Sequence, residues 1–147
     1  MSTTDVGLTG RDPGAVLYVE NDENDVFLLR RAWTVLRLRQ PLHVVVDGEA
    51  AVDYLSGTGP YIDRTRHPMP FLVLLDLHLP RLSGFDVLMW IRAQPSIETL
   101  RVVVLTGLIS PNDRRRAEAL GVEAYLTKSP DFSALRESIA ALAASFG

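Results

Sequence analysis

Five short apolar runs, spaced along the chain, constrain most strongly what this sequence can fold into. They are residues 15–20, 42–47, 70–76, 100–106 and 122–128, which read AVLYVE, LHVVVD, PFLVLLD, LRVVVLT and VEAYLTK. Most of them are nearly continuous in β-branched and other apolar residues, without regular alternation with polar ones. This pattern is typical of strands in a parallel sheet that is covered on both faces.

The stretches between these runs carry helix patterns. Apolar residues recur at intervals of three or four positions, as on one face of a helix. Two of the stretches end at a glycine, and prolines lie where helices are expected to start or stop. The predicted helices are residues 25–36, 48–57, 83–94, 111–121 and 131–146. Five strands that alternate with five helices predict a doubly wound α/β domain.

The overall composition narrows the function classes. The chain has 147 residues, which suits one domain, and 47% of them are hydrophobic, which is enough for a core. It has no cysteine, which excludes disulfides, thiolate metal sites and a cysteine nucleophile. The net charge of -3 argues against nucleic acid as the main partner. No apolar run approaches the roughly 20 residues of a membrane span, so we expect a cytoplasmic protein that binds no membrane.

Polar residues follow the expected strands, and they indicate a site. In such a sheet, ligands bind outside the carboxyl ends of the strands. Those ends carry Glu20-Asn21-Asp22, Asp76, Thr106 and Lys128. Clustered oxygen ligands favour Mg²⁺, or Mn²⁺, because a cation relieves the repulsion between carboxylates. A carboxylate beside such an ion, flanked by a lysine and a threonine, is suited to accept a phosphoryl group.

Four blocks of the sequence resemble the receiver domain of two-component response regulators. They are VLYVEND, FLVLLDLHLPRLSGFDVL, VVVLTG and AYLTKSP, in the order of that family. The resemblance covers about residues 15–146. It implies a flavodoxin-like sheet of five parallel strands in the order 2-1-3-4-5, with five helices. We therefore expect a flexible lead over residues 1–14, a receiver domain over residues 15–147, and no output domain.

The resemblance also implies roles for single residues. Asp76 takes the place of the phosphoacceptor, and Lys128 takes that of the phosphate partner. Thr106 and Tyr125 match the switch hydroxyl and the switch aromatic. The intervals from Asp76 to Thr106, 30 residues, and from Thr106 to Lys128, 22 residues, fit the family. Purely structural roles stay open for both switch residues: Thr106 could be an ordinary strand residue, and Tyr125 a core aromatic.

The metal site implied by the resemblance contains a departure from the family. Glu20, Asn21, Asp76 and the backbone carbonyl of His78 match its ligands, but the family has a second acid where this chain has Asn21. An amide oxygen can bind Mg²⁺ but brings no charge, so we expect weaker binding. Asp22 is a further candidate ligand, and a helix N-cap is its competing role.

A second departure follows the lysine. The family usually has Lys-Pro there, often with a cis peptide bond, whereas this chain has Lys128-Ser129-Pro130. A cis bond before a serine would cost about 3 kcal/mol, which puts the family's geometry in doubt at this loop. A third feature is the long polar segment 56–70, which, with the run DVFLLRRA, looks most like the small regulators paired with phytochrome-type histidine kinases.

Two functions remain open from the sequence. The first is a single-domain response regulator in a phosphorelay, which takes a phosphoryl group from a histidine kinase and switches a protein-binding face. Its next partner would be a downstream protein, a phosphotransfer protein or a second copy in a homodimer. The second is a non-phosphorylated pseudo-receiver that binds proteins constitutively. Neither is an enzyme in the ordinary sense. A flavin-type cofactor protein is disfavoured, because no glycine-rich phosphate loop follows the first strand.

Overall fold

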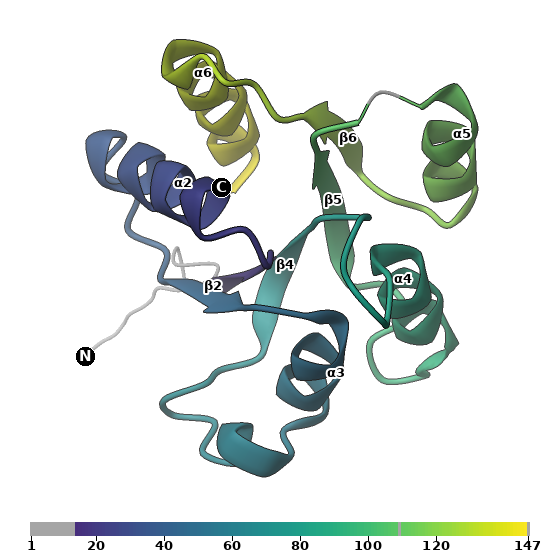
Figure 1. Cartoon of the computed structure of the whole chain (residues 1–147). Coiled ribbons are helices and arrows are strands. Elements are labelled where there is room, and N and C mark those ends of the chain that lie inside the picture. The colour runs from purple at the N-terminus through teal and green to yellow at the C-terminus, as the bar shows by residue number, and fades with distance from the viewer. Residues whose placement is uncertain (1–13, 109, 147) are drawn as a thin grey trace.

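The computed structural model of the chain describes residues 14–108 and 110–146, which form one parallel sheet with helices on both faces (Figure 1). The strands are β2 (Ala15–Val19), β3 (Leu42–Val45), β4 (Pro70–Leu75), β5 (Arg101–Thr106) and β6 (Ala124–Thr127). The helices are α2 (Glu23–Val35), α3 (Gly48–Ser56), α4 (Gly84–Ala93), α5 (Pro111–Ala119) and α6 (Phe132–Ala143), with short 3-10 turns η1 (Gly59–Tyr61) and η2 (Ala144–Phe146). Of the lead expected over residues 1–14, only Gly14 lies within the described residues.

The strand order is β3-β2-β4-β5-β6, with every neighbouring pair parallel. Counted by position in the described sheet, this is the predicted order 2-1-3-4-5, and each predicted strand and helix is confirmed. The first helix begins at Glu23, two residues before its predicted start, because the Asp22 side chain caps it. In the register, Val19 pairs with both Val45 and Leu75, so the carboxyl ends of these strands meet at one edge.

The central strand β2 is buried along its whole length and serves two cores. Val16 and Tyr18 belong to the core that α2 and α6 cover, while Leu17 and Val19 belong to the core under α3 and α4. Figure 1 shows α2 beside α6 on one face of the sheet, with α3, α4 and α5 on the other. Both faces need apolar residues, which explains why the strand sequences are continuous in them. Among the described residues, no helix is both long and apolar enough to cross a membrane.

Helix α5 packs differently from its neighbours. Within its described residues 111–119, only Ala117 is buried. The guanidinium of Arg116 lies over the ring of Phe85, 4.1 Å from its centroid, and that of Arg114 lies 5.8 Å from the centroid of the Tyr125 ring. Cation–π contacts of this kind contribute about 0.5–1 kcal/mol each at exposed positions. Arginine stacking therefore supplements a small apolar contact in holding α5 to the protein.

The long segment 56–70 is packed onto α3. The Arg64 guanidinium donates hydrogen bonds to the carbonyls of Tyr54 (2.7 Å) and Leu55 (3.0 Å) at the end of α3, and to that of His67 (3.0 Å). The Tyr54 hydroxyl donates in turn to the carbonyl of Pro68 at 2.9 Å. Carbonyls in the last turn of a helix have no hydrogen-bond donor inside the helix, and here the Arg64 guanidinium is their donor.

Candidate functional site

Three polar side chains are buried at the carboxyl edge of the sheet. Glu20 follows β2 and is 1% exposed, Asp76 follows β4 and is 5% exposed, and Thr106 ends β5 and is fully buried. Burial of two carboxylates is costly unless a cation or hydrogen bonds compensate for it. This edge therefore requires a positive partner.

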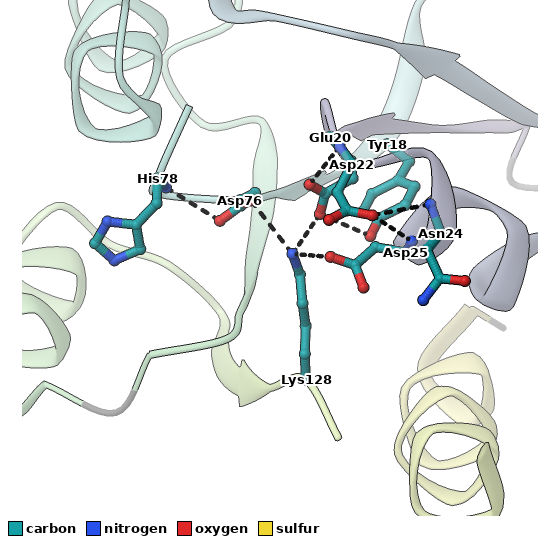
Figure 2. A network of polar contacts seen from close by, with 8 residues as sticks. All are labelled: Tyr18, Glu20, Asp22, Asn24, Asp25, Asp76, His78 and Lys128. Carbon is teal, nitrogen blue, oxygen red and sulfur yellow. Dashed lines mark hydrogen bonds and ion pairs between the residues drawn. The ribbon is translucent and has the colours of Figure 1, made fainter. Parts of the chain in front are cut away.

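Lys128, which follows β6, provides that partner. Its ammonium lies 2.5 Å from Glu20 Oε1, 2.8 Å from Asp25 Oδ2 and 3.3 Å from Asp76 Oδ2 (Figure 2). Three of these side chains follow β2, β4 and β6 and the fourth lies in α2, so the fold assembles them from distant parts of the sequence. The structure thus brings together three of the predicted strand-end residues, Glu20, Asp76 and Lys128, and adds Asp25.

The electrostatics of this cluster favour a charged lysine. Burial alone would lower the pKa of Lys128, but its hydrogen bonds to Asp25 and Glu20 outweigh burial, and that pKa lies above its usual value. Burial raises the pKa of Glu20, Lys128 opposes that change, and the charge of Asp76 reinforces it. The Tyr18 hydroxyl donates to Glu20 Oε1 at 3.1 Å, and burial, followed by the charge of Glu20, raises the pKa of Tyr18 far above its usual value. Tyr18 therefore stays a hydrogen-bond donor.

The loop after Asp76 is fixed by backbone contacts. The backbone N–H of His78 donates to Asp76 Oδ1 at 3.0 Å, and the N–H of Gly84 donates to the carbonyl of Leu77 at 3.1 Å. A Cβ atom at Gly84 would lie 2.2 Å from the carbonyl oxygen of Asp76, which no side chain tolerates. Glycine at the start of α4 therefore allows the helix to approach the loop that carries Asp76.

Thr106 and Tyr125 behave differently from each other. The Thr106 hydroxyl is buried, and it has no hydrogen-bond partner among the described residues. Such a group is rare, because a buried polar atom without a partner costs free energy. The half-buried Tyr125 makes a long hydrogen bond, 3.5 Å, from its hydroxyl to the carbonyl of Leu108. Among the described residues, the Tyr125 side chain thus makes no hydrogen bond to Glu20, Asp76 or Lys128.

The residues of the acidic loop after β2 have different structural roles. Asp22 caps α2, because its Oδ1 accepts from the backbone N–H groups of Asn24 (2.8 Å) and Asp25 (3.1 Å). Its own N–H donates to Glu20 Oε2 at 3.1 Å. Asn21 is exposed. The capping role weighed for Asp22 is confirmed, and its assignment as a metal ligand stays a prediction.

The residues present fit a weakly charged metal site. Among the side chains that the structure describes, no group of three or more Asp, Glu, His or Cys is arranged to hold a metal ion. The predicted ligand set has two carboxylates, Glu20 and Asp76, together with the Asn21 amide and the His78 carbonyl, and it stays a prediction. An all-oxygen set of this kind suits Mg²⁺, which keeps several of its waters.

The loop after Lys128 keeps a trans geometry. All peptide bonds in the described residues are trans, including that between Lys128 and Ser129. The Lys128 N–H donates to the carbonyl of Thr106 at 2.7 Å, and the Ser129 hydroxyl accepts from the N–H of Asp131 at 3.1 Å. The serine thus closes the turn into α6, whose N-cap is Asp131.

Sequence reasoning missed two residues of the cluster. Tyr18 was assigned only to a strand, and Asp25 only to the start of a helix. The signal for Asp25 was present in the acidic run after β2, because a residue in the first turn of a helix can face the strand end that precedes it. The signal for Tyr18 was weaker, since a tyrosine in an apolar strand is usually a core residue.

Comparisons with known proteins place the chain among signalling domains. A family model described as the response regulator receiver domain matches residues 16–140. The probable methanogenesis regulatory protein FilR2 of Methanothrix harundinacea is 35% identical over 135 residues, which are 90% of this chain and 83% of that protein. The response regulator Rcp1 of Synechocystis sp. is 35% identical over 117 residues, which are 80% of this chain and 78% of that protein.

Solved structures agree with these matches. The phosphorylated cyanobacterial phytochrome response regulator RcpA superposes with a TM-score of 0.79 at 31% identity, covering 88% of this chain and 90% of that one. The Mn²⁺-bound form of Rcp1 gives 0.78 at 32% identity, with 88% and 91% covered. RPA3017, a response regulator in red light signaling of R. palustris, gives 0.82 at 32% identity, with 88% and 90% covered. The similarity therefore extends over most of each chain.

Proposed function

Because this chain belongs to the response regulator receiver domain family, we propose that it is a phosphorylation switch whose phosphoacceptor is Asp76. The observation that carries the proposal is the pair of groups around this carboxylate. Lys128 lies 3.3 Å from it, and the neighbouring strand ends in the buried hydroxyl of Thr106, which no other described residue hydrogen-bonds. A cation and a free hydrogen-bond donor beside one carboxylate suit the arrival of an anionic group.

The proposed reaction is transfer from a phosphohistidine of a histidine kinase. A carboxylate oxygen of Asp76 forms a P–O bond while the P–N bond breaks, and the imidazole leaves with the electron pair and takes up a proton. Lys128 neutralises charge on the phosphoryl oxygens, and the Thr106 hydroxyl donates to one of them. Glu20, Asn21, Asp76 and the His78 carbonyl would hold Mg²⁺, which would supply further positive charge.

The proposed switch follows from the same residues. Thr106 gains its missing hydrogen-bond partner only when the phosphoryl group is present, so the phosphorylated state favours a shift of β5 toward Asp76. Tyr125 makes one long hydrogen bond, contacts the Arg114 guanidinium and packs against a small apolar cluster that includes Val104 of β5, so a shift of β5 would make its ring repack. The surface near α5 and β6 would then change its preference between protein partners.

The names of the relatives support a narrower proposal about the kinase. RcpA is a phytochrome response regulator and RPA3017 is a response regulator in red light signaling, and each match covers 88% of this chain. We infer that a phytochrome-type histidine kinase phosphorylates this chain. The chain then acts as a phosphoacceptor for that kinase, and a downstream protein, a phosphotransfer protein or a second copy receives the signal.

Intact mass measurement tests the proposed function. The protein is mixed with acetyl phosphate and Mg²⁺, and we expect a covalent adduct of one phosphoryl group. Asp76→Asn should abolish the adduct, whereas Asp63→Asn, which changes an exposed aspartate of the segment 56–70, should keep it. Absence of an adduct on folded wild-type protein at high Mg²⁺ would sink the proposal.

That negative result would favour a second candidate, the non-phosphorylated pseudo-receiver. The observation in its favour is the exposed amide of Asn21 at the place of an acid, together with the lack of a three-acid metal cluster among the described residues. Such a protein would bind the same partner with or without Mg²⁺ and acetyl phosphate. A switch would bind it differently in the two conditions.

A further inference from the structure

Asp25 lies at the site without belonging to the proposed metal ligands. It is in the first turn of α2, and its side chain is 28% exposed. Its Oδ2 accepts a hydrogen bond from the Lys128 ammonium at 2.8 Å, which is shorter than the 3.3 Å contact between Lys128 and Asp76. The lysine is therefore bound more closely to α2 than to the proposed phosphoacceptor.

The ammonium of Lys128 is surrounded by carboxylates in this arrangement. An ammonium group has three N–H donors, and three carboxylates, those of Glu20, Asp25 and Asp76, contact it (Figure 2). A phosphoryl oxygen that approaches Lys128 competes with these carboxylates for its N–H groups. The structure thus contains a competition for a single cation.

Asp25 is the partner that can be released most easily. Glu20 also accepts from the Tyr18 hydroxyl and from the N–H of Asp22, and both bonds fix its position. Asp76 carries the incoming group itself. Among the described residues, the carboxylate of Asp25 is hydrogen-bonded to Lys128 alone, and it is the most exposed of the three. Water can replace its lost contact at small cost.

We propose that Asp25 is a positioning residue that holds Lys128 at the strand ends before phosphorylation and loses it to the phosphoryl group. The inference rests on the proposed function of Asp76. It also assigns Asp25 a charge role, since Asp25 supplies a third carboxylate near a site whose second family acid is replaced by Asn21. Release of the lysine frees the first turn of α2, so this turn responds to the state of Asp76.

The first arm of the test uses protein free of metal and phosphoryl donor. Lys128 is the only lysine of the chain, so its ammonium gives a single side-chain signal in nuclear magnetic resonance of protein with isotope-labelled lysine. A hydrogen-bonded ammonium exchanges slowly with water and stays visible. We expect a sharp signal in wild type, a signal broadened by faster exchange in Asp25→Asn, where only Glu20 and Asp76 remain as carboxylate partners, and a sharp signal again in Asp25→Glu.

Glu23→Gln is the matched control for this arm. Glu23 is an exposed acid in the same turn of α2, so the variant removes the same charge without touching Lys128. The lysine signal should persist in it. An unchanged signal in folded Asp25→Asn, or equal broadening in both variants, would overturn the positioning role, and this result does not depend on phosphorylation.

The second arm adds beryllofluoride, a phosphoryl mimic, with Mg²⁺. We expect the backbone signals of residues 23–26 to shift in wild type together with that of Thr106. Asp25→Asn removes a competitor for Lys128, so beryllofluoride should bind this variant about fivefold more tightly than it binds wild type. Glu23→Gln should stay within about twofold of wild type.

The two arms separate the inference from the function on which it rests. Beryllofluoride could bind without shifting the signals of residues 23–26 and without binding Asp25→Asn more tightly. In that case Lys128 keeps its contact with Asp25, and the proposed release of the lysine is wrong. If beryllofluoride shifts no residue, including Thr106, then the proposed function fails and the release with it. The first arm would still decide whether Asp25 positions Lys128 in the unphosphorylated protein.

Discussion

The hydroxyl of Thr106 should lower the stability of the unphosphorylated protein and also contribute to the proposed switch, and one substitution can separate the two effects. It is fully buried at the end of β5 and has no hydrogen-bond partner among the described residues. Valine has nearly the same shape and a similar preference for strands. At this residue, stability and switching therefore make opposite demands on the side chain.

Thr106→Val should stabilise the unphosphorylated protein, by about 1 kcal/mol, because it removes a buried polar atom without a partner. The same variant should respond less to beryllofluoride, since the phosphoryl mimic loses a donor. Urea denaturation measures the first effect and titration the second. Thr127→Val, at an exposed threonine of β6, serves as the control and should change neither. A less stable Thr106→Val would contradict the absence of a partner.

Asn21 sets the charge of the proposed metal site. Asn21→Asp should tighten Mg²⁺ binding by about tenfold, because an added carboxylate raises the ligand charge. Without metal it should destabilise the protein, since Glu20 and Asp76 are already close by. Calorimetric titration with Mg²⁺ checks the gain. If affinity does not rise, then either Asp25 already supplies the missing charge, or Asn21 does not face the metal.

The strand-end residues were predictable because a parallel sheet places its carboxyl ends together. Glu20, Asp76 and Lys128 each follow an apolar run, so recognising the strands was enough to group them. Asp25 was not predictable in the same way. Its contact with Lys128 depends on where the first turn of α2 points, and this direction is set by the Asp22 cap.

At the scale of elements, the segment 56–70 illustrates how a long loop is held by a few groups. Its composition is polar, so the sequence indicated an irregular loop and no more. The structure shows Arg64 bound to three carbonyls and the rings of Tyr54, Tyr61 and His67 packed together. These contacts join the loop to the end of α3 and to itself, and they follow no helix or strand periodicity, so the local sequence pattern does not reveal them.

Arg64→Ala should lower the free energy of unfolding by about 2 kcal/mol, because three carbonyls lose a charged donor. Arg66→Ala, two residues later at an exposed position, should have an effect within about 0.5 kcal/mol. Denaturant unfolding of both variants makes the comparison. Phosphorylation by acetyl phosphate should be unchanged in Arg64→Ala, since the segment lies away from Asp76. Equal losses in both variants would show that general charge removal is responsible.

At the scale of the whole molecule, the sheet concentrates negative charge at one edge. Three carboxylates meet there around one lysine, so the folded state gains from a further cation while the unfolded chain does not. The fold itself was predictable, because continuous apolar strands alternating with helices leave few arrangements. The balance of charge at the edge depends on side-chain geometry and was not.

Mg²⁺ should therefore raise the melting temperature, by about 5 °C at a concentration roughly a hundred times its dissociation constant. A chelator should reverse the rise. Sodium chloride at the same ionic strength separates specific binding from screening, and it should produce a smaller change. Asp76→Asn should require more Mg²⁺ for the same shift. Equal effects of the two salts would exclude a specific site.

Helix α5 has a consequence for the way in which the molecule opens. Only Ala117 of its described residues 111–119 is buried, and stacked arginines provide much of the remaining attachment. Local opening of an element costs least where few apolar contacts must break. The amide hydrogens of α5 should therefore exchange with solvent deuterium sooner than those of α4, whose five buried residues anchor it. A detached α5 would form part of the native ensemble before the sheet itself begins to unfold.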